Sequence, residues 1–252
     1  MRPYTRSLHP DDYEFLRAYT APIVAFQQDM VVRGVPHREW HPHRFWEYAS
    51  IMQQLMQLGV QTDAELIDVG AGASFFDPYL ALLYPRLCCT DTEKYGDYSW
   101  MVQKQREVYG VALPLYNLAV EDMSPRMEIG WGGATEKFDI TMCISTIEHV
   151  DDHDKGFREL IRITKPGGLI FVTSDYFQDA VHFEQSVSRH LQVTDYNEKF
   201  VRDLPNRFEV DFVGETDLGY RGDFVHNYSF CNVCLRKRQY PLAASSMTTE
   251  KA

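Results

Sequence analysis

A ten-residue stretch in the first third of the chain constrains the fold most strongly. Leu66–Val69 is a short apolar run broken by one acid, Asp68, which is typical of a buried parallel strand. Gly70 and Gly72 follow at alternate positions, and an apolar helical pattern begins after them. Glycines reach positive φ and let a ligand approach bare main chain, while the helix N-terminus offers unpaired N–H groups. The stretch predicts a nucleotide-binding corner, with a simple tight turn as the alternative.

A second acid supports the ligand-binding interpretation. Leu87–Thr90 is again short and apolar, and Asp91 follows it directly. An acid about 20 residues beyond the glycine turn is placed to accept hydrogen bonds from ribose hydroxyls. Asp68 stands at the carboxyl end of the preceding strand, where ligands of open α/β sheets collect. The carboxyl ends of both strands therefore indicate a nucleotide-binding site.

Strand and helix patterns alternate from residue 64 onward, which predicts a doubly wound α/β fold with a mainly parallel sheet. The remaining strands are expected at 112–116, 138–144, 169–173, 208–213 and 228–235, and helices at 100–109, 154–163 and, inserted, 183–204. Residues 1–62 are expected to be a helical cap over the pocket, with helices starting at Asp11 and spanning about 44–58. Residues 239–252 are small and polar and are expected to be a disordered tail.

Composition limits the possible partners. The formal net charge is −11, and the one basic run is Arg236–Arg238, so neither DNA nor RNA is expected to bind. No stretch approaches the ~20 apolar residues of a membrane span, and the N-terminus lacks the apolar core of a secretory signal. No membrane association is therefore expected.

The five cysteines all fall in predicted strands. Cys231 and Cys234 have the spacing of a metal-binding pair, but in a strand their side chains point to opposite faces, and no second pair completes a zinc site. Buried, reduced thiols and a cytoplasmic protein are expected, without a bound metal.

In the motifs described above, the chain resembles a class I S-adenosylmethionine-dependent methyltransferase of the small-molecule type. The resemblance covers about residues 64–236. The matching segments are 66–72, Asp91, 138–140, 148–150 and 160–171, of which the last contains Lys165-Pro166-Gly167-Gly168 before an apolar strand. The resemblance implies a seven-stranded sheet with an antiparallel last strand, S-adenosylmethionine as cofactor, and methyl transfer to an oxygen, nitrogen or carbon atom of a small acceptor by in-line displacement at the sulfonium. The family often has a third glycine where Ser74 stands, so altered contacts to the methionine part are expected.

The resemblance also implies a set of cofactor-binding residues at the ends of the predicted strands. They are Asp68 for the ammonium group, Gly70, Ala71 and Gly72 for the methionine and ribose, Asp91 for the ribose hydroxyls, Thr92 near the adenine, Asn117 for the adenine amino group, and Ser145 as a pocket wall. Asp122 is the alternative to Asn117. Because the sulfonium is positive, backbone and acids are expected to line the pocket, without lysine or arginine.

His149 is the candidate general base, because it follows Glu148 at the end of the fourth strand, beside the expected cofactor. In this family such a Glu-His pair often closes the strand and caps the next helix, so a structural role is the alternative. Further candidates are Asp175, His182 and His226. A metal-assisted variant with Glu148, His149 and His182 is not favoured, since the RNA-end methyltransferases that use one carry a further acid where Ser145 stands.

Two other functions compete with methyl transfer. A nicotinamide-dependent oxidoreductase would carry G-x-G-x-x-G, but Phe75 occupies the position of the third glycine. A non-catalytic binding module could retain the fold, although the intact acids and glycines argue against this. The acceptor itself is not identified; the cap, the 183–204 insert and the loop at 215–227 are expected to form its pocket.

Overall fold

The computed structural model describes residues 4–38, 44–92, 98–123, 135–179, 196–222 and 229–239. Most of the predicted insert, nearly all of the predicted tail, and the candidate bases His182 and His226 lie outside these ranges.

One sheet organises the described part of the chain, with the strand order β4-β3-β2-β5-β6-β9-β1-β8 and with β7 also paired to β9. The strands are β1 Thr5–Ser7, β2 Leu66–Val69, β3 Leu87–Asp91, β4 Leu115–Asn117, β5 Phe138–Ile144, β6 Thr164–Tyr176, β7 Val210–Phe212, β8 Thr216–Asp217 and β9 Ser229–Lys237. Strands β4, β3, β2, β5 and β6 run parallel, while β9 is antiparallel to both β6 and β7. The predicted mainly parallel sheet with an antiparallel last strand is confirmed.

The sheet is larger than the seven strands predicted, because β1 and β8 extend it. Strand β1 pairs antiparallel with β9 and parallel with β8. The pairing at Arg6 and Ser7 joins the first residues of the chain to Asn232 and Cys231, near the other end. A three-residue polar strand with such distant partners leaves no local periodic pattern in the sequence.

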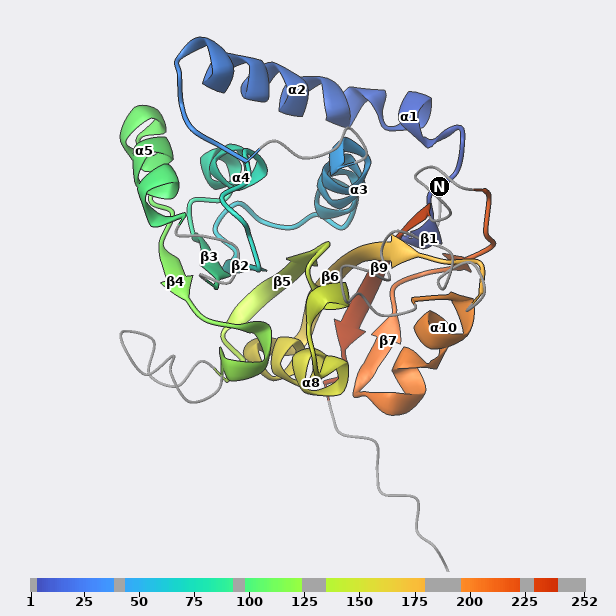
Figure 1. Ribbon diagram of the computed structural model, residues 1–252. Helices are drawn as coiled ribbons and strands as arrows, with labels where there is room; N and C mark the ends of the chain where they lie inside the picture. The colour runs from blue at the N-terminus through green and yellow to red at the C-terminus, as the bar shows by residue number, and fades with distance from the viewer. Residues whose placement is uncertain are drawn as a thin grey trace, which may run out of the picture.

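Helices cover both faces of the sheet (Figure 1). They are α1 Asp12–Phe15, α2 Arg17–Val32, α3 Arg44–Gln57, α4 Phe76–Leu83, α5 Ser99–Tyr109, α8 His153–Ile163 and α10 Glu198–Arg207, with short 3-10 helices η2 Val120–Asp122 and η3 Ile147–His149. Apolar residues of α2 to α5 pack on one face, and those of α8 and α10 on the other. In the described residues, no helix is both long enough and apolar enough to cross a membrane.

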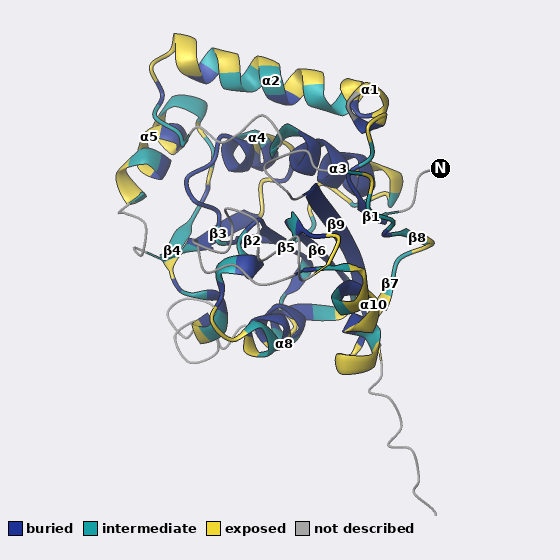
Figure 2. Cartoon of the chain, turned by 45° about the vertical axis from the view of Figure 1, so that its right-hand side comes forward, coloured by how far each residue is buried: buried dark blue, intermediate teal, exposed yellow. Residues whose placement is uncertain are grey.

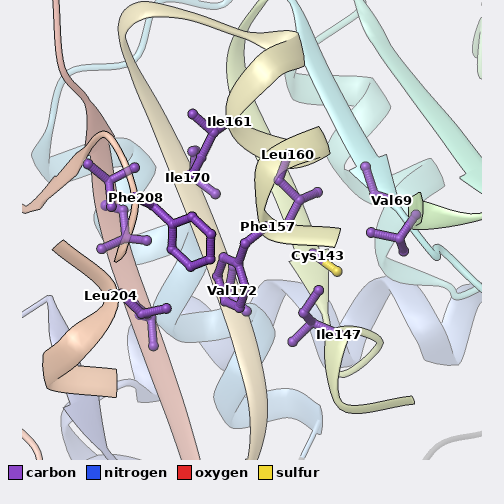
Figure 3. Packing of buried hydrophobic residues seen from close by; sticks show 14 of the residues in the cluster. Val69, Cys143, Ile147, Phe157, Leu160, Ile161, Ile170, Val172, Leu204 and Phe208 are labelled. Carbon is purple, nitrogen blue, oxygen red and sulfur yellow. The ribbon is translucent and has the colours of Figure 1, made fainter. Parts of the chain in front are cut away.

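The two faces follow from alternation along each strand. In β2, Ile67 and Val69 join the cluster around α8, whereas Leu66 joins the cluster around α4. Figure 3 shows the first cluster, with residues of α8 against strands β5 and β6. Cys231 and Cys234 of β9 fall in opposite clusters, as predicted. All five cysteines are buried and free.

The N-terminal segment is part of the core and not only a cover. Ten consecutive residues of α3, from Trp46 to Leu55, are buried, which Figure 2 shows as a dark helix beneath the exposed outer face of α2. Trp46 donates its indole N–H to Asp12 at 3.0 Å, and Asp12 also pairs with Arg6 of β1. The expectation that residues 1–62 are only helical is therefore wrong, since β1 belongs to the sheet. The domain boundary near residue 62 stays a prediction.

Candidate functional site

A cavity of about 290 Å³ lies at the carboxyl ends of β2, β3 and β5. It is lined by Arg38, Arg44, Tyr48, Asp68, Gly70, Ala71, Gly72, Ser74, Asp91, Thr92, Leu118, Val120, Ile144, Ser145, Thr146 and His149. The structure thus brings together eight of the nine residues that the sequence predicted for cofactor binding and catalysis. This edge of a parallel sheet is where ligands of α/β proteins bind.

The turn after β2 adopts a conformation that glycine favours. Gly70 and Gly72 have φ values of 82° and 63°, and Ala73 between turn and helix has 53°. The N–H groups of Gly70 and Ala71 donate to the carbonyl of Thr90, at 2.8 and 3.0 Å, which fastens the turn to β3. Ser74 accepts N–H bonds from the first turn of α4 through its hydroxyl, so it opens that helix.

Replacement of Gly70 by alanine should destabilise the fold. A Cβ built there lies 2.2 Å from Cγ2 of Thr146, and the residue has positive φ. Overpacking and a left-handed backbone together should cost at least about 2 kcal/mol in the free energy of unfolding. Gly110→Ala is the matched control, since Gly110 has φ +64° but no atom within 4 Å of such a Cβ. Equal losses in thermal denaturation of the two variants would contradict the predicted clash.

Asp91 closes the other side of the turn. Its two carboxylate oxygens accept the N–H groups of Gly72 and Thr92. Burial raises the pKa of Asp91, and these two N–H groups, with the nearby Arg38, act in the opposite direction. The carboxylate is therefore held in one orientation in the wall of the cavity.

Asp68 is 2% exposed and lines the cavity. Its Oδ1 atom is buried without a hydrogen-bond partner in the described structure. A buried carboxyl with an open oxygen is costly unless a donor or cation meets it. Asp68 thus offers an acceptor to a cationic ligand.

Two arginines line the cavity, which the sequence analysis did not expect. The backbone N–H of Arg38 donates to the carbonyl of Ala73 at 3.2 Å, and its guanidinium donates to the hydroxyl of Tyr98 at 2.6 Å. Arg44 begins α3 and pairs with Glu47 at 3.3 Å. The expectation of a pocket without lysine or arginine is wrong, because it considered only the turns after the strands and not the segment that folds over them.

The cavity wall at Ser145 is polar and buried. Ser145, with φ 41°, donates its hydroxyl to Glu47, and its N–H donates to the carbonyl of Thr173 at 3.0 Å. Burial, followed by the charge of Asp175, raises the pKa of Glu148 well above its ordinary value, and Arg44 opposes this. The buried carboxyl groups of Glu47 and Glu148, which do not line the cavity, therefore lie near the charge of Arg44.

The Glu-His pair is divided between core and cavity. Glu148 is 1% exposed, whereas His149 lines the cavity and is half-buried. The backbone N–H of His149 donates to the carbonyl of Thr146 at 3.0 Å, which closes η3. The backbone thus has a structural role, and the side chain has access to a ligand.

Asn117 is the predicted residue that does not line the cavity. It ends β4 as expected and pairs in register with Asp91, but its side chain is exposed. Leu118 and Val120 line the cavity from this loop instead. The alternative, Asp122, is 56% exposed and pairs with Lys155 at 3.3 Å. An adenine contact from Asn117 or Asp122 stays a prediction.

Sequence reasoning missed Arg38, Arg44 and Tyr48. Tyr48 is buried and stacks on Phe76 with ring centroids 4.3 Å apart, which joins α3 to α4. The amphipathic pattern of α3 was visible in the sequence, but nothing local indicated that its first turn faces the sheet edge. Among the described residues, no group of three potential metal ligands is clustered.

Comparisons with known proteins agree on one fold. Residues 67–172 match the family model described as a methyltransferase domain. A ubiquinone biosynthesis O-methyltransferase of Pseudomonas savastanoi pv. phaseolicola is 24% identical over 144 residues, which cover 52% of this chain and 58% of that protein. The chain therefore spans little more than half the length of the curated relatives it matches.

Solved structures resemble nearly the whole chain. Geranyl diphosphate C-methyltransferase from Streptomyces coelicolor A3(2), in complex with Mg²⁺, geranyl diphosphate and S-adenosyl-L-homocysteine, has a TM-score of 0.59 at 12% identity, over 92% of this chain and 99% of that one. The cyclase SpnF has a TM-score of 0.58 at 13% identity, over 92% and 97%. Such identities show the fold alone, and a cyclase among the neighbours illustrates that the fold does not fix the reaction.

Proposed function

We propose that the protein, whose residues 67–172 match the family model described as a methyltransferase domain, is a class I methyltransferase that transfers the methyl group of S-adenosylmethionine to a small-molecule acceptor. The observation that carries the proposal is the pair of acids at the ends of neighbouring strands, Asp68 and Asp91, on either side of the glycine turn in one cavity. The S-adenosyl-L-homocysteine in the geranyl diphosphate C-methyltransferase structure supports the choice of cofactor.

The residues present fit this cofactor. The open oxygen of Asp68 suits the ammonium group, and the fixed carboxylate of Asp91 suits the ribose hydroxyls. Gly70, Ala71 and Gly72 present backbone to the methionine and ribose. Thr92 and Ser145 form walls on either side, and the bound cofactor supplies an electrophilic methyl group on a sulfonium.

A dinucleotide is a poorer fit. Phe75 stands where a third glycine would allow close helix packing, and it is 1% exposed. The centroid of its ring lies 5.5 Å from that of Tyr48 and 5.4 Å from that of Phe45. A large side chain built into the core at this position supports the methyltransferase proposal over a nicotinamide-dependent oxidoreductase.

In the proposed reaction, the protein aligns the acceptor with the methyl group, since positioning supplies much of the rate. His149 takes a proton from a hydroxyl acceptor, and Arg44 and Ser145 line the same cavity. Assays with methyl-labelled S-adenosylmethionine and a panel of phenols, acids and amines test the proposal. Label should appear in at least one acceptor, and a protein that binds no S-adenosylmethionine would contradict it.

The proposal also covers the cellular compartment of the protein and the chemical class of its acceptor. Five buried, free cysteines support a reducing compartment, and we propose the cytoplasm. The net charge of −11 supports a small molecule over a nucleic acid as the acceptor.

Arg38 should bind the carboxylate of the cofactor, because it lies beside the glycine turn and one charge-assisted contact suits that group. Arg38→Gln should weaken binding of S-adenosylmethionine about tenfold, equivalent to roughly 1.4 kcal/mol. Calorimetry checks this, with decarboxylated S-adenosylmethionine as the control ligand. The control should bind the variant and the wild-type protein equally, and an equal loss for both ligands would assign Arg38 a purely structural role.

A further inference from the structure

We propose that Asp68 and Asp77 share one proton in the cofactor-free protein and release it when the ammonium group of the cofactor binds. Asp77 is absent from the cavity lining, so it acts through Asp68 as a positioning residue. The inference rests on the proposed function, because it concerns the same ligand.

The two carboxyl groups meet between the sheet and a helix. Asp68 lies on β2, flanked in register by Cys89 of β3 and Met142 of β5. Asp77 is the second residue of α4, which covers this face. Both residues are 2% exposed, and their carboxyl groups are hydrogen-bonded to each other. Two carboxylates in such contact cannot both ionise in an apolar setting, so one proton remains between them.

The surroundings favour the protonated pair. Burial raises the pKa of both acids, and for Asp68 the next cause is Asp77 itself. The titratable groups that act on the pair or are affected by it are Asp91, Cys88 and Cys89 of β3, Tyr48 of α3 and Cys143 of β5, each of which is neutral or negative. Two cations, Arg38 and Arg44, line the same cavity. None of the charges that act most strongly on Asp68 is positive.

The hydroxyl of Ser74 decides where the proton resides. It donates to Oδ2 of Asp77 at 2.7 Å, which stabilises the ionised form of that residue. Asp68 is therefore the protonated partner and donates to Asp77. Its Oδ1 atom, buried without a partner, remains the acceptor that a ligand can meet.

A cationic ammonium group at Asp68 replaces this proton, which passes to the solvent. Below the pKa of the pair, binding expels one proton, so affinity rises about tenfold for each pH unit. The rise ends where the pair is already ionised. At still higher pH the α-amino group of the cofactor, whose ordinary pKa is about 7.7–8.0, itself loses its proton, and affinity falls.

Calorimetric titration with S-adenosylhomocysteine at a series of pH values from 7 downward, in buffers of different ionisation enthalpy, measures the protons released. Where the pair still holds its proton, the wild-type protein should release close to one proton per ligand bound. Asp77→Asn should release distinctly fewer, because its amide donates to an ionised Asp68 and does not titrate. Asp203→Asn, an exposed acid on α10, is the matched control and should behave as the wild type.

Binding without proton release by the wild type, or equal release by Asp77→Asn, would overturn the shared proton and leave the proposed function standing. If Asp77→Asn does not fold, the wild-type affinity between pH 6 and 7 decides, and a constant value refutes the inference. A wild-type protein that binds no S-adenosylhomocysteine at any pH would overturn the proposed function and this inference with it.

Discussion

Replacement of His149 by alanine should lower the rate of methyl transfer to a hydroxyl acceptor by about 10²–10⁴-fold, the usual contribution of a general base. The imidazole lines the cavity, whereas the neighbouring Glu148 is enclosed in the core. Only neutral imidazole accepts a proton, so wild-type turnover should fall as the pH drops and the imidazole becomes protonated. The variant should lose this pH dependence and keep its affinity for the cofactor.

His153→Ala is the matched control for a structural role. His153 lies four residues further on, at the start of α8, and its Nδ1 is 2.9 Å from the hydroxyl of Tyr196. It is not part of the cavity lining. This variant should lose thermal stability without a change in the pH profile. If His149→Ala does the same, the imidazole of His149 has only a packing role, and the base lies elsewhere.

Replacement of Asp91 by alanine should weaken binding of S-adenosylmethionine by about 1.5–3 kcal/mol, or roughly 10- to 150-fold. The carboxylate is the proposed acceptor for the ribose hydroxyls, and hydrogen bonds to a charged group are worth this much. The same carboxylate accepts the N–H groups of Gly72 and Thr92, so part of the loss arises from a loosened turn. Calorimetry on the folded variant measures the total loss of binding free energy from both contributions.

A second ligand separates the two contributions. Methionine carries the amino-acid part of the cofactor without its ribose, so a loosened turn would weaken methionine and S-adenosylmethionine alike. If Asp91 contacts the ribose directly, Asp91→Ala should lose affinity mainly for S-adenosylmethionine and little for methionine. Unchanged affinity for S-adenosylmethionine in the folded variant would remove Asp91 from the site.

The central strands and the glycine corner could be predicted because their signals are local. Apolar runs, glycines and acids at strand ends all occur within a few residues of each other around Asp68 and Asp91. Strand β5 forms at the predicted residues, 138–144. Strand β4 was predicted at 112–116 but forms at Leu115–Asn117. It begins only after Pro114, which has no N–H to donate to a neighbouring strand.

The features that could not be predicted depend on distant contacts. Strand β1 exists because Arg6 and Ser7 pair with Asn232 and Cys231 of β9. The hydroxyl of Thr5 adds hydrogen bonds to the main chain of Cys234, 229 positions away. Arg38 and Arg44 reach the cavity because the N-terminal segment folds over the sheet edge, and no periodicity in their own neighbourhood encodes that path. The proton shared by Asp68 and Asp77 likewise needs two elements to be packed before the acids meet.

Titration of the wild-type protein with S-adenosylhomocysteine, beside a parallel titration with NADH, tests the central claim most directly. The account predicts saturable binding of S-adenosylhomocysteine at one site per chain and no binding of NADH. A crystal of the complex should place the ribose against Asp91 and the ammonium group against Asp68. Saturable binding of NADH, without binding of S-adenosylhomocysteine, would contradict the account.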